Sequence, residues 1–170
     1  RERTDVALLP NGCHIAEIEI DPDTGEVELD TYAEVDDFGT VINHVVVEGQ
    51  VHGGVMQGAG QALGEQCVYE RETGQLLTGS FADYYLPRAA DIPEFRIGEH
   101  PVPTLSNPLG AKGAGEAGTT GALAAIMNAV IDALRPRGIV EMDMPAKTCP
   151  QPRCASGGRC VKRRRNRGGL

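Results

Sequence analysis

The chain has 170 residues and a formal net charge of −8, with 41% hydrophobic and 24% charged residues. Such a length is enough to bury the core of one domain. The sequence has no run of about 18 apolar residues that could cross a membrane and no signal peptide. We therefore expect a soluble, cytoplasmic chain whose true amino terminus lies further upstream, and no nucleic acid among its partners.

Residues 14–35 have the pattern of a β-hairpin. Apolar and acidic residues alternate from His14 to Ile20, a turn is favoured by Asp21-Pro-Asp-Thr-Gly25, and alternation resumes from Val27 to Val35. In the second strand we expect one side to hold Val27, Leu29, Thr31, Ala33 and Val35. The hairpin would then have an acidic outer face.

Two adjacent aspartates, Asp36 and Asp37, end the hairpin and invite comparison with a metal site. Neighbouring residues of a strand point to opposite sides, however, and aspartate serves equally well in a turn. His52 has no partner at the spacing of metal ligands. Cys13 and Cys67 are too isolated to hold an iron–sulfur cluster and are expected to be small core residues. The sequence predicts no metal held by protein ligands.

A helix is predicted from Val47 to Leu63, although it contains glycines at 53, 54, 58 and 60. Each glycine costs about 1 kcal/mol relative to alanine. Three reasons remain open: close backbone approach to a cofactor, close approach to a neighbouring helix, or a loop that replaces part of the helix. A second hairpin is expected from Gln66 to Arg71 and from Gln75 to Thr78. Five prolines between positions 87 and 108 then predict an extended path.

The extended path leads to a Gly-rich segment, Gly110-Ala-Lys-Gly-Ala-Gly-Glu116. Glycines let backbone amides approach a ligand closely, and a helix amino terminus favours anions. Since Glu116 would repel a phosphate, we interpret it as a base whose pKa is raised by poor solvation. The alternative is an acidic residue in a first helical turn, which stabilises the helix dipole by about 0.3 to 1 kcal/mol.

A buried helix is predicted after Glu116, because apolar residues recur there at spacings of three and four. Alanines fill the positions between them. The apolar residues are Leu123, Ile126, Met127, Val130, Ile131 and Leu134.

The charge divides sharply near residue 146. All 24 acidic residues lie in residues 1–146 with 8 of the 16 basic ones, so this part carries −16 and the tail +8. The tail has no apolar periodicity, and its three cysteines fit no standard zinc pattern. We interpret residues 147–170 as the product of a reading-frame change or as an expressed, disordered tail; a metal or RNA site is the least favoured reading. Either of the first two predicts that the tail contributes nothing to the fold.

Several segments in this order together resemble the molybdopterin-binding large subunit of the xanthine oxidase, aldehyde oxidoreductase and aerobic carbon monoxide dehydrogenase family. They are Asn11–His14, Val35–Asn43, Val47–Leu63, Ser80–Pro87 and Gly110–Glu116. The resemblance covers about residues 5–146. Because the family's subunit is several times longer, the chain resembles only its carboxy-terminal portion.

The resemblance implies that Glu116 is the catalytic base beside molybdenum. It also implies that the cofactor lies against Gln57, Gly58, Lys112, Gly113, Ala114 and Gly115. The cofactor would be molybdenum–molybdopterin, in its plain or its cytosine dinucleotide form. Partners would be the missing amino-terminal part of the same subunit, subunits that carry iron–sulfur clusters and FAD, and a small-molecule substrate.

The implied fold is α+β, with two antiparallel hairpins packed against two main helices. The implied activity is oxidation or hydroxylation of a purine, aldehyde, N-heterocycle or carbon monoxide, with water as the oxygen source. A second hypothesis is a truncated, non-catalytic module that keeps the fold but binds no cofactor. Molybdenum content would separate the two.

Overall fold

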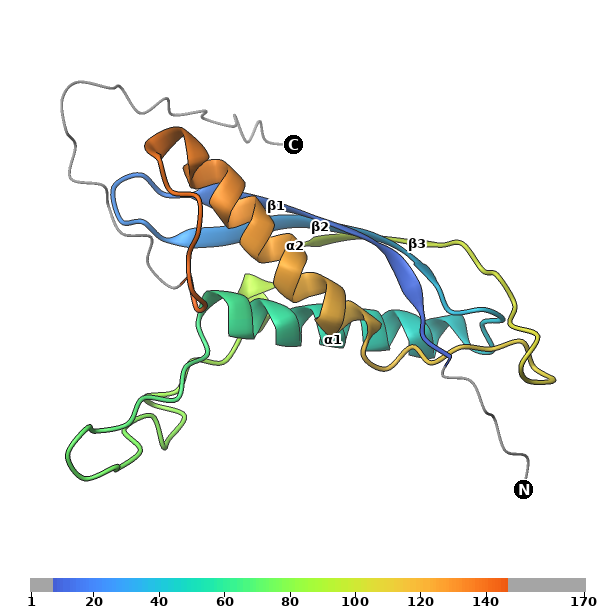
Figure 1. The fold of residues 1–170 in the computed structure, drawn as a ribbon, viewed down its shortest axis with the longest axis horizontal. Coiled ribbons are helices and arrows are strands. Elements are labelled where there is room, and N and C mark those ends of the chain that lie inside the picture. Colours follow the sequence, from blue (N-terminus) through green and yellow to red (C-terminus); the bar gives the residue numbers. More distant parts are fainter. Residues whose placement is uncertain (1–7, 147–170) are drawn as a thin grey trace.

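The computed structural model describes residues 8–146, in which a three-stranded sheet packs with two long helices (Figure 1). The sheet order is β1-β2-β3. The α+β class is confirmed, whereas the expectations for residues 147–170 lie outside the described residues. The elements are β1 (Asn11–Ile20), β2 (Val27–Asp37), α1 (His44–Leu63), η1 (Ala89–Asp91), β3 (Glu94–Glu99), α2 (Ala117–Leu134) and η2 (Arg135–Arg137).

A β-bulge changes the face that β2 presents to the core. β1 and β2 pair antiparallel as predicted, but Glu17 lies opposite Thr31 while the next residue, Ile18, lies opposite Leu29. Asp30 is therefore an extra residue, and every side chain beyond it moves to the other face.

The bulge corrects the predicted inward set of β2. Leu29 is buried as expected, but Tyr32, Glu34 and Asp36 are buried with 0%, 2% and 1% exposure, whereas Val35 is 49% exposed. The expected acidic outer face is therefore only partly right, because Glu34 points inward, and so does Asp36, which was expected in a turn.

The third strand differs from the predicted second hairpin. Residues 66–78 turn back on themselves as predicted but add no strand to the sheet: an antiparallel bridge joins Tyr69 and Leu76, and Glu70 donates its amide to the Gln75 carbonyl at 2.8 Å, in an arm that projects from the body of the fold (Figure 1). The third strand comes instead from the proline-rich path, where β3 pairs parallel with β2 from Thr31↔Glu94 to Asp36↔Glu99. A strand at the edge of a sheet tolerates the prolines that flank β3. The second hairpin is therefore present only as this short bridged turn outside the sheet, and the sheet itself consists of one hairpin and a parallel third strand.

The glycines of α1 let it approach α2 closely. A Cβ added at Gly54 would lie 3.0 Å from the Thr119 amide nitrogen, and one at Gly58 would lie 2.6 Å from the Ala122 Cβ. Gly53, in contrast, has no atom within 4 Å of an added Cβ. Of the reasons left open by the sequence, approach to a neighbouring helix is the one seen for Gly54 and Gly58.

The apolar stripe of α2 forms much of the core, as predicted. Ile126, Met127, Val130 and Leu134 are buried, and α2 packs against both α1 and β1. Contrary to expectation, the stretch Ala117–Arg137 is long and apolar enough by composition alone to cross a membrane, with a mean hydropathy of 1.4. A core helix meets the same criterion, and 33% of the 18-residue segment that meets it is buried inside the fold.

Cys13 and Cys67 are free and exposed, so their prediction as core residues is wrong. Cys13 lies on the face of β1 that points away from the helices, where strand alternation places it together with Ile15. Cys67 lies in the projecting arm. The exposure of both cysteines is therefore decided by where each lies in the fold and not by residue type.

Candidate functional site

The Gly-rich segment is held by the residues that follow β2. Lys112 donates its amide to the Phe38 carbonyl at 2.8 Å, and Thr40 donates to the Gly110 carbonyl at 2.9 Å. Gly110 has a φ of 67°, a left-handed conformation that favours glycine. The start of the segment is therefore fixed to the sheet, and the path of the following residues is set by that attachment.

Asp37 joins this segment to two other parts of the chain. Its Oδ1 accepts hydrogen bonds from the backbone amides of Gly39, at 2.8 Å, and Val102, at 2.9 Å. Its Oδ2 accepts a hydrogen bond from the ammonium of Lys112. These contacts, led by the Lys112 hydrogen bond, hold the pKa of the Asp37 carboxyl well below its usual range. The side chains of Asp37 and Lys112 are only 8% and 13% exposed.

The Lys112 side chain therefore stabilises the fold through its ion pair with Asp37. The sequence predicts that the cofactor lies against Lys112, and the structure pairs the Lys112 ammonium with Asp37, 75 residues away. The backbone of Lys112 is anchored as well. Removal of this side chain is therefore expected to destabilise the fold, because it leaves the Asp37 carboxylate buried without its counter-charge.

We expect Lys112→Met to lower the melting temperature of the cofactor-free subunit by several degrees, since Asp37 loses its counter-charge. Adding Asp37→Asn should recover part of the loss, because the amide oxygen can still accept from Gly39 and Val102. Thermal unfolding of both variants measures the effect. Unchanged stability of Lys112→Met together with lost cofactor would support the original assignment instead.

Residues 113–115 leave one side of the backbone open. Gly113 has no atom within 4 Å of an added Cβ, and Gly115 has only the Gln50 Nε2, at 3.9 Å. Both glycines are exposed, whereas Ala114 packs partly against the core. A loop with an anchored start and open glycines suits the close approach of a flat, oxygen-rich group, and so fits the pterin.

Glu116 occupies the N-cap position of α2. Its carbonyl accepts the Thr120 amide at 3.0 Å, but its side chain makes no capping hydrogen bond and is exposed. The side chain therefore does not cap the helix, and the weaker interaction with the helix dipole is the structural reason that remains for an acidic residue here. The described residues do not enclose it either, so the desolvation expected for a base must come from elsewhere.

Gln57 lies on α1 beside the first turn of α2. Its Oε1 is 3.5 Å from the Thr119 hydroxyl, three residues after Glu116. The structure thus brings Gln57 close to the segment that carries Glu116. Gly58 is different: it is buried, and α2 occupies the space beside it, so the contact that the structure shows is helix packing.

Gln50 was missed by the sequence interpretation. Its side-chain amide is the nearest group to the open side of Gly115. Gln50 and Gln57 are seven residues apart on α1, a spacing that places both on one helix face. That spacing is the signal that would have identified it.

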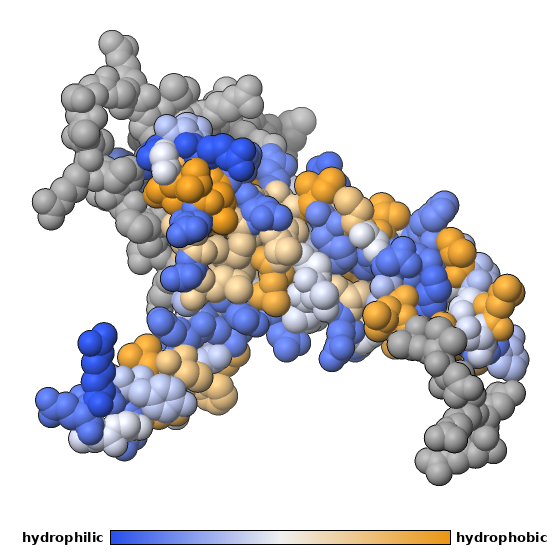
Figure 2. Space-filling model, in the orientation of Figure 1, coloured by the Kyte–Doolittle hydropathy of each residue, from blue (hydrophilic) through white to orange (hydrophobic). Residues whose placement is uncertain are grey.

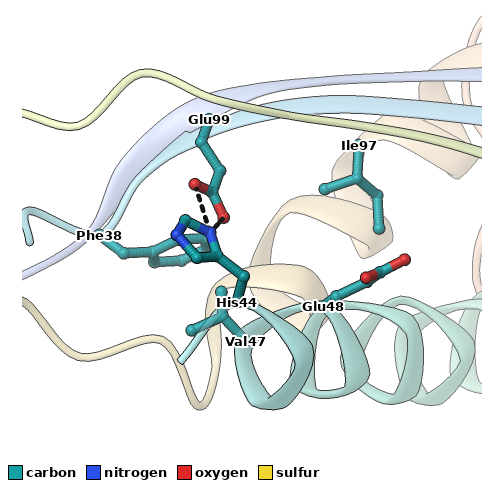
Figure 3. Close-up of a pocket in the computed structure, with 6 residues that line it drawn as sticks. All are labelled: Phe38, His44, Val47, Glu48, Ile97 and Glu99. Carbon is teal, nitrogen blue, oxygen red and sulfur yellow. Dashed lines mark hydrogen bonds and ion pairs between the residues drawn. The ribbon is translucent and has the colours of Figure 1, made fainter. Parts of the chain in front are cut away.

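A separate pocket of about 260 Å³ lies between α1 and β3 (Figure 3). It is lined by Phe38, His44, Val47, Glu48, Ile97 and Glu99, and His44 pairs with Glu99 at 3.1 Å. None of the predicted cofactor-binding residues lines it. The open glycines and Glu116 therefore form a different site.

Comparison with known proteins identifies the family of this chain. Residues 2–93 match the molybdopterin cofactor-binding domain family. The chain is 43% identical over 143 residues to the nicotine 6-hydroxylase large subunit of Paenarthrobacter nicotinovorans, covering 84% of this chain and 17% of that one. It is 35% identical over 136 residues to the carbon monoxide dehydrogenase large chain of Hydrogenophaga pseudoflava, covering 80% and 17%.

Solved structures of related enzymes have the same fold. Quinoline 2-oxidoreductase from Pseudomonas putida 86 superposes with a TM-score of 0.77 at 40% identity, covering 80% of this chain and 17% of that one. The fold is that of a molybdopterin-binding large subunit. The chain belongs to the molybdopterin-binding large-subunit family that includes carbon monoxide dehydrogenase and xanthine dehydrogenase. It spans 17% of the length of the first two of these relatives.

Proposed function

We propose that this chain is the carboxy-terminal part of the large subunit of a molybdenum hydroxylase, and that Glu116 is its catalytic base. The observation that carries the proposal is an exposed carboxylate with no capping role, placed directly after open glycines. The family membership supports it. The relatives are named for the oxidation of nicotine, carbon monoxide and hypoxanthine, which supports a small-molecule substrate.

When bound, molybdenum–molybdopterin would supply the two-electron redox chemistry of substrate oxidation. Glu116 would accept a proton from water during that reaction, with water as the oxygen source. A general base of this kind must lie within hydrogen-bond reach of the proton that it takes. The anchored loop gives Glu116 a fixed backbone position, since Lys112 and Asp37 hold its start and α2 holds its end.

Gly113, Ala114 and Gly115 would hold the pterin by their backbone, and Gln57 would donate or accept a hydrogen bond through its amide. Gln50 lies close enough to Gly115 to take part in the same contact. For Gly58 a direct cofactor contact remains the weaker assignment, because α2 covers it. The cytosine dinucleotide form of the cofactor belongs to this proposal and rests on the family resemblance alone.

The missing part of the subunit would supply the enclosure that Glu116 lacks. Large apolar side chains are exposed in the described residues, among them Leu105 (103%), Phe81 (85%) and Val45 (78%). Orange apolar areas gather over several parts of the surface (Figure 2). Exposed apolar area of this kind marks surfaces that pack against other protein. Iron–sulfur and flavin subunits would be the electron acceptors, in the cytoplasm.

Molybdenum analysis of the complete protein tests the proposal. We expect one molybdenum per large subunit after expression with an intact cofactor pathway, and a lower content in Gln57→Ala because a polar cofactor contact is lost. Gln61→Ala is the matched control, since Gln61 is an exposed residue one turn further along α1. A complete protein that folds but contains no molybdenum would favour the non-catalytic module.

A further inference from the structure

A cluster of buried ionisable groups lies on the sheet, apart from the Gly-rich site. The bulge in β2 turns Glu34 and Asp36 inward, and β1 places His14 opposite Glu34. The His14 Nε2 is 3.0 Å from Asp36 Oδ1, and its Nδ1 is 3.5 Å from Glu34 Oε2. One ligand atom from each of the three residues lies within 4.8 Å of the others.

The carboxylates of this cluster are not satisfied by the protein. The side chains of Glu34 and Asp36 are 0% and 2% exposed. Both oxygens of Glu34, and Oδ2 of Asp36, are buried without a hydrogen-bond partner. Within the described part of the chain, His14 is the one basic group that pairs with either carboxylate, so at most one positive charge faces two acids. Buried charges normally have partners or bind metal ions.

Two glycines make the room in which these side chains meet. A Cβ added at Gly12 would lie 1.7 Å from Asp36 Oδ1, and one at Gly121 of α2 would lie 2.4 Å from His14 Nδ1. The Tyr32 hydroxyl, 2.8 Å from His14 Nδ1, fixes the ring from the sheet side. The groups are therefore enclosed between the sheet and α2, unlike acidic residues that gather on a surface.

We propose that His14, Glu34 and Asp36 bind one divalent metal ion between the sheet and α2, in addition to the molybdenum cofactor. An imidazole nitrogen with carboxylate oxygens suits borderline ions such as Zn²⁺, whereas Ca²⁺ and Mg²⁺ prefer oxygen ligands alone. The ion would offset the surplus negative charge and coordinate oxygens that otherwise lack partners. It would enter beside His14, whose side chain is 10% exposed.

Such an ion would tie β1 and β2 together beneath α2. Gly121, which lies against the His14 ring, is five residues after Glu116 on the same helix. The metal site would thus support the helix whose N-cap residue is the proposed base. The sequence interpretation assigned no metal ligands, because it placed Glu34 on the outer face and Asp36 in a turn.

The test is zinc binding by the complete, purified protein after EDTA treatment and dialysis. We expect about one equivalent of Zn²⁺ per large subunit by elemental analysis. In His14→Asn and Glu34→Gln the affinity should fall by more than the roughly 10- to 100-fold that loss of an outer-sphere partner causes. Glu28→Gln, an exposed acid on the same strand, and His44→Ala, an exposed histidine, are the matched controls and should bind normally.

A second measurement needs no variant and so covers the case in which the substituted proteins fail to fold. Zn²⁺ added to the EDTA-treated wild-type protein should slow amide exchange in residues 11–16 and 32–37. Wild-type protein that binds less than a small fraction of an equivalent would overturn the proposal, and the cluster would then hold shared protons. Zinc bound without slower exchange in these strands, or bound equally by folded His14→Asn, would also overturn it.

Discussion

Replacing Glu116 with glutamine in the complete protein should cut turnover by about 10² or more, the lower end of what a general base contributes. The side chain makes no capping hydrogen bond and is exposed, so its loss removes no contact that holds α2. Glutamine keeps the volume and the polarity but cannot accept the proton. Molybdenum content and thermal stability should therefore stay near those of the wild-type protein while steady-state turnover falls.

Glu141→Gln is the control for a simple loss of one surface charge, because Glu141 is exposed in a coil beyond α2. It should leave turnover unchanged. If Glu116→Gln retains activity within a few-fold of wild type, Glu116 is not the base, and its position at the N-cap has only a structural meaning.

Gly58→Ala should destabilise the helix pair, even though alanine is the better helix former. The new methyl would lie 2.6 Å from the Ala122 Cβ and 3.1 Å from the Thr119 carbonyl, so the helices must move apart. Overpacking of this kind costs about 1 to 3 kcal/mol, against a gain of about 1 kcal/mol from helix propensity. Denaturant unfolding of the cofactor-free subunit measures the net loss.

Two further variants make this result specific. Gly53→Ala adds the same methyl on the same helix where no atom lies within 4 Å, so it should stabilise by about 0.5 to 1 kcal/mol. Gly58→Ala combined with Ala122→Gly removes the closer contact and should recover part of the loss. Equal effects of Gly53→Ala and Gly58→Ala would show that close helix packing is not the reason for glycine at 58.

Local sequence patterns were sufficient where one segment decides its own conformation. The first hairpin follows from alternation and a turn sequence, and α2 follows from apolar spacing. The Gly-rich segment and Glu116 were likewise readable, since open backbone before a helix requires glycine and a lone carboxylate is conspicuous there. The same motifs sufficed to place the chain in its family.

Contacts between distant residues were not readable in this way. The pairing of Lys112 with Asp37 spans 75 residues and gives a predicted cofactor contact a structural role as well. The parallel pairing of β3 with β2 depends on where the chain returns after α1 and the projecting arm. Glycines at 53 and 58 look alike in the sequence, but only the second lies at the crossing with α2.

The sequence by itself determined the first hairpin, the two helices, the Gly-rich segment and the family, because these depend on short-range periodicity and turn chemistry. Tertiary structure decided which side chains meet. One extra residue at Asp30 reverses the faces of β2, so that Glu34 and Asp36 turn inward to His14. The alternation of residues within a strand does not reveal a bulge, because the bulge is set by the register with the partner strand. The buried cluster could therefore be found only from the tertiary structure.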